Sequence, residues 1–217
     1  MPPKPKYTKE EIVNAAYELT REKGIDAVVA REVGKRLNTS SSPIFTLWNS
    51  MEELKMEVWM LAKQKYQAYM EDIFDYTPAF KEYGMRCVRF AAEEPNLYRM
   101  LFLTERENHS PYLRFKEEFG TLYARLVEEI RKSFELSGED AEELLNQMII
   151  FANGIAAFLI TDKRSFSEES VSRHLSQVCI GAVMVRRLRS GSISWDEANG
   201  MANYYDMSAI PKKKPLN

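Results

Sequence analysis

The side chains in this chain with the clearest capacity for specific polar contacts are the hydroxyls of Ser41, Ser42 and Thr46, which lie between Val29 and Trp48. Small hydroxyl side chains on a helix can approach the edges of nucleic-acid bases and the neighbouring phosphates. Contacts of this kind serve to recognise a binding partner and do not catalyse a reaction. We therefore take this stretch as the first candidate site.

Residue types that could catalyse a reaction or hold a metal are few and widely spaced. The sequence has no Gly-rich phosphate loop, nucleophile elbow or paired-histidine motif. The adjacent carboxylates Glu93–Glu94 and Glu142–Glu143 fall on amphipathic helices, where solvated surface is their expected place. No metal-ligand spacing joins the cysteines and histidines, which are Cys87, Cys179, His109 and His174. The sequence predicts no enzyme, no metal and no cofactor, and it predicts that both cysteines are buried free thiols.

The candidate stretch has the pattern of two short helices joined by a tight turn. Apolar residues at Val29, Val33 and Leu37 form one helical face, and Asn38 can take the left-handed conformation that ends a helix. Ser40 or Ser41 can cap a second helix, and Pro43 suits its first turn. In that helix three apolar residues are expected to turn inward: Ile44, Leu47 and Trp48. Two helices joined this tightly place a helix in the DNA major groove, and an ordinary helical hairpin is the alternative.

Capping boxes flank the candidate stretch on both sides. Thr8 with Glu11 opens a helix that Gly24 closes, and Ser50 with Glu53 opens a long helix. That long helix is expected to run from Met51 to about Phe74, which would make it a rigid lever between two domains.

The segment from Lys9 to Leu61 resembles the DNA-binding domain of the tetracycline-repressor (TetR) family of transcription regulators. Four features carry the resemblance without insertion or deletion: Gly24, the pair Val33-Gly34, the helix Ser42–Trp48 and the start Ser50–Leu54. The resemblance implies a DNA-binding domain over residues 1–49 and an effector-binding and dimerisation domain over residues 50–217. It implies DNA contacts by Arg31, Lys35, Ser40, Ser41, Ser42, Thr46 and Asn49.

The chain also departs from the pattern of that family at residues that commonly bind phosphate. Val29 stands where the family has Thr or Ser, and Leu47 and Met51 replace a Tyr and a Lys. Ser41, Ser42 and Pro43 stand where Lys, Gly and Thr are usual. Phosphate contacts supply much of the affinity of such proteins, so binding is either weaker or carried by other cations: Lys4, Lys6, Lys9, Arg31, Lys35 and Arg36.

No strand pattern persists anywhere, so the predicted fold class is all-α. The expected later helices are residues 78–94, 96 to about 105, 111–134, 139–161, 167–189 and 195 to about 205. Pro211–Pro215 is expected to be a disordered tail. The junction from Phe90 to Phe102 is similar to one found in the effector domains of one branch of TetR-like regulators.

In that family the last long helix pair packs against its twin, which implies a homodimer through residues 139–161 and 167–189. Small residues suit close helix packing, either between subunits or within one: Ala152, Ala156, Ala157, Gly181 and Ala182. A small apolar effector would be lined by aromatic, Met and polar side chains, although plain core packing is the alternative for each: Cys87, Phe90, Tyr98, Phe102, Tyr123, Met148, Phe151 and Asn153.

Charge and composition are compatible with this reading. Residues 1–49 hold eight basic and six acidic side chains, whereas the whole chain carries a net charge of −2. The mean hydropathy is −0.41, and the apolar run Met148–Ile160 is shorter than a membrane span, so we expect a cytoplasmic protein without a membrane partner. The predicted function is a ligand-responsive repressor that binds double-stranded operator DNA as a homodimer and is released by an apolar small molecule. The alternative is a TetR-fold ligand-binding or adaptor protein with weak or lost DNA binding.

Overall fold

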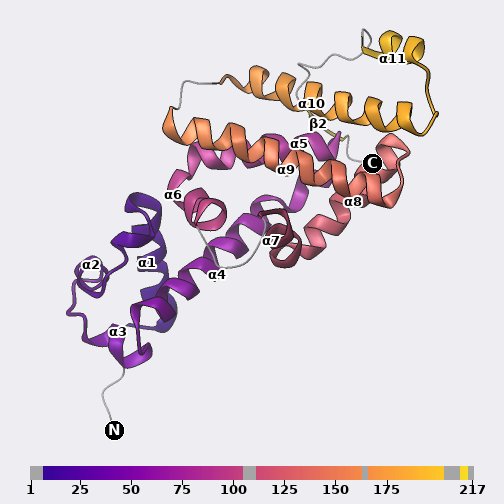
Figure 1. Cartoon of the computed structure of the whole chain (residues 1–217). Helices are drawn as coiled ribbons and strands as arrows, with labels where there is room; N and C mark the ends of the chain where they lie inside the picture. The colour runs from indigo at the N-terminus through magenta and orange to yellow at the C-terminus, as the bar shows by residue number, and fades with distance from the viewer. Residues whose placement is uncertain (1–6, 105–110, 163–165, 203–210, 215–217) are drawn as a thin grey trace. The chain divides into compact units, whose positions relative to one another are not determined.

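The computed structural model describes residues 7–104, 111–162, 166–202 and 211–214, and these are predominantly helical (Figure 1). The predicted all-α class is confirmed. The chain forms two compact units, one of residues 1–69 with 93–106 and the other of residues 70–92 with 107–217. This division differs from the expected boundary after residue 49, because the fourth helix packs against the first.

The first unit is built on helices α1 and α4, which pack against each other. Thr8 accepts the Glu11 amide hydrogen bond and Glu11 accepts from Thr8 N, so the predicted capping box is present. Gly24 ends α1 with φ 87°, as expected. The elements of the unit are α1 (Lys9–Lys23), the 3₁₀ helix η1 (Ile25–Ala27), α2 (Ala30–Arg36), α3 (Ser42–Leu47), α4 (Met51–Tyr69), α6 (Pro95–Tyr98) and the π-helix η3 (Arg99–Leu103).

Two helical segments of this unit differ from the sequence prediction, one in its end and one in its type. Helix α4 ends at Tyr69, and not near Phe74; the buried Met70 has φ −96° and ψ 0°, and a 3₁₀ helix follows it. The helix expected from residue 96 to about 105 is instead the short α6 continued by η3. Its predicted end at Glu105 lies outside the described residues.

A Schellman motif ends α2 and forms the turn to α3. Asn38 has φ 51°, which confirms the left-handed conformation predicted for it. Thr39 N donates to Gly34 O at 2.9 Å, and Asn38 N donates to Lys35 O at 3.1 Å. These two bonds satisfy carbonyls that the helix end would otherwise leave free. The direction of the chain after α2 is therefore fixed by backbone hydrogen bonds.

The turn crosses α2 at Gly34, where no side chain larger than hydrogen fits. A Cβ atom on Gly34 would lie 2.9 Å from Ser40 O and 3.0 Å from Thr39 O. Both neighbours are backbone atoms, which cannot rotate away as a flexible side chain can. Gly34 is therefore the residue that sets how closely α2 and the chain leading to α3 approach each other.

Helix α3 packs through one face only. Ile44 is 1% exposed and Trp48, directly after the helix, is 4% exposed, as predicted. Leu47 was predicted to turn inward, but 41% of it is exposed. The prediction for Leu47 is wrong because it lies three residues beyond Ile44, on the flank of a helix that is buried along one narrow stripe.

The second unit consists of the 3₁₀ helix η2, α5, the helices α7 to α11 and two very short strands. Helix α9 packs against α8 and α10, as Figure 1 shows. The elements are η2 (Glu71–Asp75), β1 (Tyr76–Thr77), α5 (Ala79–Glu93), α7 (Pro111–Glu118), α8 (Gly120–Phe134), α9 (Gly138–Thr161), α10 (Glu168–Arg189), α11 (Trp195–Ala202) and β2 (Lys212–Lys213). The predicted end of α11 near Tyr205 lies outside the described residues.

Helix α9 is longer than the apolar run that the sequence argument considered. It has 24 residues and is apolar enough, by length and composition, to cross a membrane. Within its most apolar window 44% of the residues are buried inside the unit. The argument from shortness therefore does not hold for α9, and its length and composition are only weak evidence for a membrane span.

One predicted helix is broken in two. The helix expected over residues 111–134 divides at Phe119, which has φ −123° and ψ 33°. The Phe119 ring is 1% exposed and stacks on Phe115 with ring centroids 5.0 Å apart. Helix α8 then ends at Glu135, with φ 52° and Leu136 N donating to Arg131 O, ahead of the glycine at 138.

The expected tail after residue 211 is also wrong for its described part. Thr77 pairs with Lys212 and Tyr76 with Lys213 in a two-stranded antiparallel sheet. Lys214 N donates to Asp75 O at 2.7 Å. Strands this short carry no periodic sequence pattern, so the sequence alone could not predict them.

Helix α5 carries a buried ion cluster. Arg86 donates from Nε to Glu82 Oε1 at 2.8 Å and pairs with Asp72. Glu82 is 3% exposed and Arg86 is 8% exposed. Hydrogen bonding to Arg86 holds the pKa of Asp72 below its usual range. A charge this deeply buried is tolerated only while its partner is present.

We predict that Gly34→Ala destabilises the first unit by about 1–3 kcal/mol, because the new methyl group overlaps backbone oxygens of the turn. Urea unfolding followed by circular dichroism measures this change. The matched control is Gly138→Ala, where a Cβ would have no neighbour within 4 Å and a change below about 0.5 kcal/mol is expected. Equal stability of the two variants would show that the turn does not depend on Gly34.

We further predict that Arg86→Ala lowers the unfolding free energy by about 3–5 kcal/mol, because the buried Glu82 then loses its hydrogen-bonded cation and keeps only Arg89, 3.9 Å away. Arg86→Met combined with Glu82→Leu should be markedly less damaging, since no charge then remains buried. Urea unfolding of the single and double variants gives the comparison. A double variant less stable than Arg86→Ala would contradict this account of the cluster.

Candidate nucleic-acid interface

The surface of α3 that faces away from the core is centred on hydroxyl side chains. Ser42 and Thr46, one turn apart, are both exposed. Thr46 Oγ donates its proton to Ser42 O at 3.0 Å, so only its acceptor capacity remains for a partner. The structure thus places these two predicted contact residues side by side on the helix.

The two predicted caps of α3 behave differently from expectation. Ser41 occupies the capping position but has helical φ and ψ and makes no side-chain cap. Ser40 Oγ instead accepts a hydrogen bond from Ser42 N at 3.4 Å. Ser40 is exposed and Ser41 half-buried, so Ser40 is the more accessible of the two hydroxyls.

Apolar side chains flank the hydroxyls of α3, a feature that the sequence analysis did not use. Phe45 is 55% exposed and Leu47 is 41% exposed, one on each side of Thr46. No residue of α3 carries a charge. The helical spacing of Ile44 and Trp48 could have revealed this, because it places residue 45 outside the buried stripe.

Two of the cations expected to replace the missing phosphate contacts are already paired. Arg36 donates two hydrogen bonds of 2.8 Å to Glu22, which hold the pKa of Glu22 below its usual range. Lys9 lies 2.5 Å from Glu57, and that carboxylate also accepts from Trp48 Nε1 at 3.0 Å. These pairs stabilise the first unit internally and leave Arg36 and Lys9 less free to bind phosphate.

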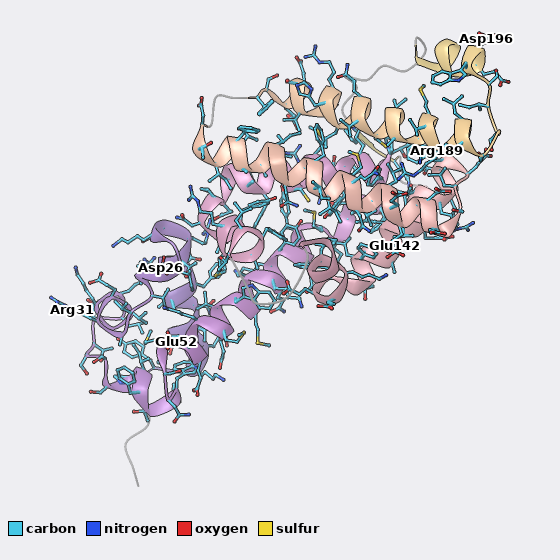
Figure 2. All side chains as sticks on the ribbon, viewed as in Figure 1. Asp26, Arg31, Glu52, Glu142, Arg189 and Asp196 are labelled. Atoms are coloured by element: carbon cyan, nitrogen blue, oxygen red, sulfur yellow. The ribbon has the colours of Figure 1, made fainter. Side chains whose placement is uncertain are left out.

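Arg31 and Lys35 remain accessible. They lie one helical turn apart on α2, both are exposed, and neither forms an ion pair with any residue that the structure describes. In Figure 2 the Arg31 side chain extends outward from the first unit. Lys4 and Lys6 lie outside the described residues. Arg31 and Lys35 are therefore the best-placed described cations for backbone phosphates.

Asn49, the last predicted contact residue, has a structural role. Its backbone N donates to Glu53 Oε2 at 2.9 Å and its Nδ2 donates to Glu53 Oε1 at 3.2 Å. Ser50 Oγ accepts from Glu53 N at 3.3 Å, which is half of the predicted capping box. The Glu53 carboxylate accepts from Asn49 at the start of α4, while the Glu53 backbone N donates to Ser50.

The eight predicted effector-binding residues fall in different units. Tyr98 and Phe102 belong to the first unit, where Phe102 packs on Tyr98 and Tyr66 with ring centroids 4.9 and 5.0 Å apart. The other six belong to the second unit: Cys87, Phe90, Met148, Tyr123, Phe151 and Asn153. The first four of these are 7% exposed or less, and Phe151 and Asn153 are half-buried. Most of these side chains are core residues.

The polar members of that set have partners inside the chain. Asn153 Nδ2 donates to Ile149 O at 2.8 Å, within its own helix. Tyr123 Oη donates to Asn146 Oδ1 at 2.8 Å, and burial raises the pKa of this phenol to about 12. Both predicted free cysteines are buried, and burial raises the pKa of Cys179 to about 12. The Tyr123 phenol and the Cys179 thiol are therefore neutral at physiological pH.

Helices α9 and α10 expose apolar side chains to solvent. Phe158 is 64% exposed and Ile150 is 56% exposed on α9, while Val185 and Val178 are 46% and 37% exposed on α10. Gly181 is exposed between the two valines. Two of the small residues expected at an interface are instead buried within the unit, Ala152 at 3% and Ala156 at 0%. Exposed apolar surfaces of this kind are typical of sites that contact another protein, a membrane or a ligand.

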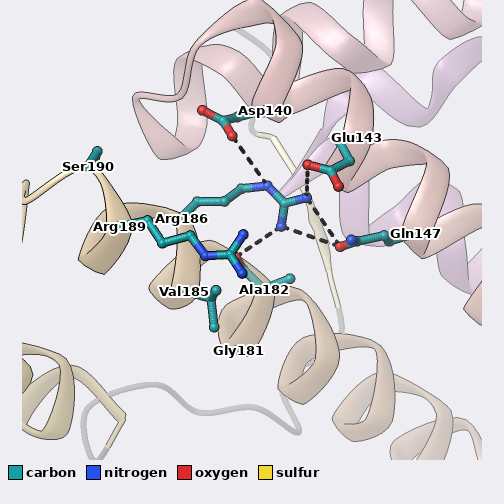
Figure 3. A pocket seen from close by; sticks show the side chains of 9 residues that line it. All are labelled: Asp140, Glu143, Gln147, Gly181, Ala182, Val185, Arg186, Arg189 and Ser190. Carbon is teal, nitrogen blue, oxygen red and sulfur yellow. Dashed lines mark hydrogen bonds and ion pairs between the residues drawn. The ribbon is translucent and has the colours of Figure 1, made fainter.

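A buried guanidinium lies beside this apolar surface. Arg186 contacts Glu143 Oε2 at 3.0 Å and donates to Gln147 Oε1 at 3.3 Å and Ala182 O at 3.1 Å, as Figure 3 shows. Its side chain is 8% exposed. The hollow around it measures about 470 Å³, is open to solvent and reaches Gly181. Arg186 ties α10 to the start of α9, which the sequence analysis did not foresee.

Comparison with models of protein families, with curated proteins and with solved structures found no match for this chain.

Proposed function

We propose that this protein is a transcription regulator that binds double-stranded DNA through α2, the turn at Asn38 and α3. The observation that carries the proposal is the way the first unit presents α3. Its buried side holds Ile44 and Trp48, and its outer side projects Ser42 and Thr46. In a helix-turn-helix DNA-binding motif, a short recognition helix packs through one face on a second short helix and presents its other face to the DNA.

Charge on α2 supports the same proposal. Arg31 and Lys35 are exposed and form no ion pair with a described residue, whereas Lys9 and Arg36 each have one. Cations that remain unpaired on a surface can neutralise phosphates and release counterions from DNA. In this division of roles, α2 supplies the sequence-independent contacts and α3 supplies the contacts with bases.

We further propose that the protein acts as a homodimer whose subunits contact each other through α9 and α10. The exposed Phe158, Ile150 and Val185 are the support for this assignment. A single short recognition helix contacts few base pairs, and two-fold symmetry doubles the length of the site. Gly181, with open space around it, permits close approach of a second helix.

Release of DNA by a small apolar effector is the remaining part of the proposal, and it rests on the TetR resemblance. Two hollows in the described part of the chain, one near Arg186 and one between α1 and α4, are lined by side chains outside the predicted set. An effector that prefers the DNA-free protein would release the operator by that difference in affinity, and operator DNA would weaken effector binding by the same factor. The second candidate function, an adaptor with lost DNA binding, is favoured by the two paired cations Lys9 and Arg36.

The DNA-binding proposal predicts that Lys35→Ala weakens binding to matched and scrambled DNA alike and lowers the salt slope by about one unit. A mobility shift at several salt concentrations, with the DNA upstream of the protein's own gene, measures this. Lys132→Ala, at an exposed cation of α8, is the matched control and should leave both quantities unchanged. Absence of any shift with wild-type protein at low salt would favour the adaptor.

The dimer proposal predicts that Phe158→Glu converts the protein to a monomer, because it places an unpaired charge within the apolar contact. Sedimentation velocity measures the mass in solution. Met56→Glu, at a residue of α4 with similar exposure, should leave the dimer intact. A dimer that persists with Phe158→Glu and with Ala182→Arg would remove this helix pair as the interface.

A further inference from the structure

The side chains of α3 restrict what this helix can distinguish in a DNA major groove. Guanine is usually read by Arg or Lys, adenine by Asn or Gln, and cytosine by Asp or Glu. Helix α3 has the sequence Ser-Pro-Ile-Phe-Thr-Leu and contains none of these residues. Readout by α3 therefore depends on hydroxyls and apolar groups alone.

Among the groups that bases expose in the major groove, only the C5-methyl of thymine is read by an apolar side chain. Phe45 is the most exposed apolar residue of α3, at 55%. The hydroxyl proton of Thr46 is already donated to Ser42 O, which reduces the polar readout left to the helix. An aromatic side chain held at this position has thymine as its natural target.

We infer that Phe45 is a specificity-determining residue that reads thymine methyl groups in each half-site. This inference rests on the proposed DNA binding and adds the class of base pair that α3 prefers. The ring of Phe45 packs against one or more methyl groups, and Leu47 covers the opposite flank of Thr46.

Charge complementarity identifies DNA as the occupant of this apolar surface. Arg31 and Lys35 lie on the exposed side of α2, the helix that packs against α3. Neither is neutralised by an ion pair with a described residue. Two unpaired cations beside an exposed apolar helix match a groove in which thymine methyl groups lie between rows of phosphates.

Deoxyuridine tests the inference, because it differs from thymidine only by the missing methyl group. DNA sites are first selected from a random duplex pool with the full-length protein. Each thymine of the selected site is then replaced by deoxyuridine, one at a time. Loss of one buried methyl costs about 0.8 kcal/mol, which is about a fourfold loss of affinity at a contacted position.

The decisive comparison is between wild-type protein and Phe45→Ala. We expect at least one thymine per half-site at which deoxyuridine weakens wild-type binding about fourfold but leaves Phe45→Ala unchanged, as a double-mutant cycle requires. Met60→Ala removes an apolar side chain of similar exposure, 58%, on α4 and should keep the wild-type response. Circular dichroism checks that both variants are folded.

The outcomes separate this inference from the function on which it rests. If the selection enriches no sequence and no duplex is retained at low salt, the proposed DNA binding fails and this inference fails with it. If a site is enriched but no thymine shows the Phe45-dependent loss, DNA binding stands and the role of Phe45 is overturned. Capture of a protein by the wild-type surface, with no DNA binding, belongs to the first outcome.

Discussion

The contact that most constrains this structure is the passage of the turn over Gly34. The backbone oxygens of Thr39 and Ser40 come so close to α2 that a methyl group would overlap them. Because the Schellman motif at Asn38 fixes the same turn by hydrogen bonds, α3 leaves it in one direction. The burial of Ile44, the projection of Thr46 and the exposure of Phe45 all follow from that direction.

Some polar side chains on the surface of the first unit are paired within the unit, and others are accessible to a binding partner. Arg36 is ion-paired with Glu22, and Lys9 is ion-paired with Glu57. The Asn49 side chain donates a hydrogen bond to Glu53. What remains on α2 and α3 is a pair of cations, the half-buried carboxylate of Glu32, a few hydroxyls and two apolar flanks. This remainder is suited to a partner that offers phosphates and methyl groups in a groove, which is why DNA is the partner we propose.

Local signals made much of this fold predictable, whereas contacts distant in sequence did not. The capping box at Thr8 and the left-handed Asn38 depend on neighbours within a few residues, and both predictions are confirmed. The break at Phe119 and the pairing of Tyr76 with Lys213 depend on tertiary packing, and no periodic pattern in the sequence predicts them. The same holds for the candidate site. Residue types indicated hydroxyls on α3, but only the structure distinguished the paired Arg36 from the available Arg31.

The central claim, that α2 and α3 bind duplex DNA, is tested most directly by hydrogen–deuterium exchange of the full-length protein with and without a selected duplex. Bound DNA shields amides at its contact surface from solvent. The account predicts slower exchange across residues 30–47, with peptides from the outer face of α9 and α10 unchanged at a constant oligomeric state. Unaltered exchange across residues 30–47 while the protein is saturated with DNA would contradict it.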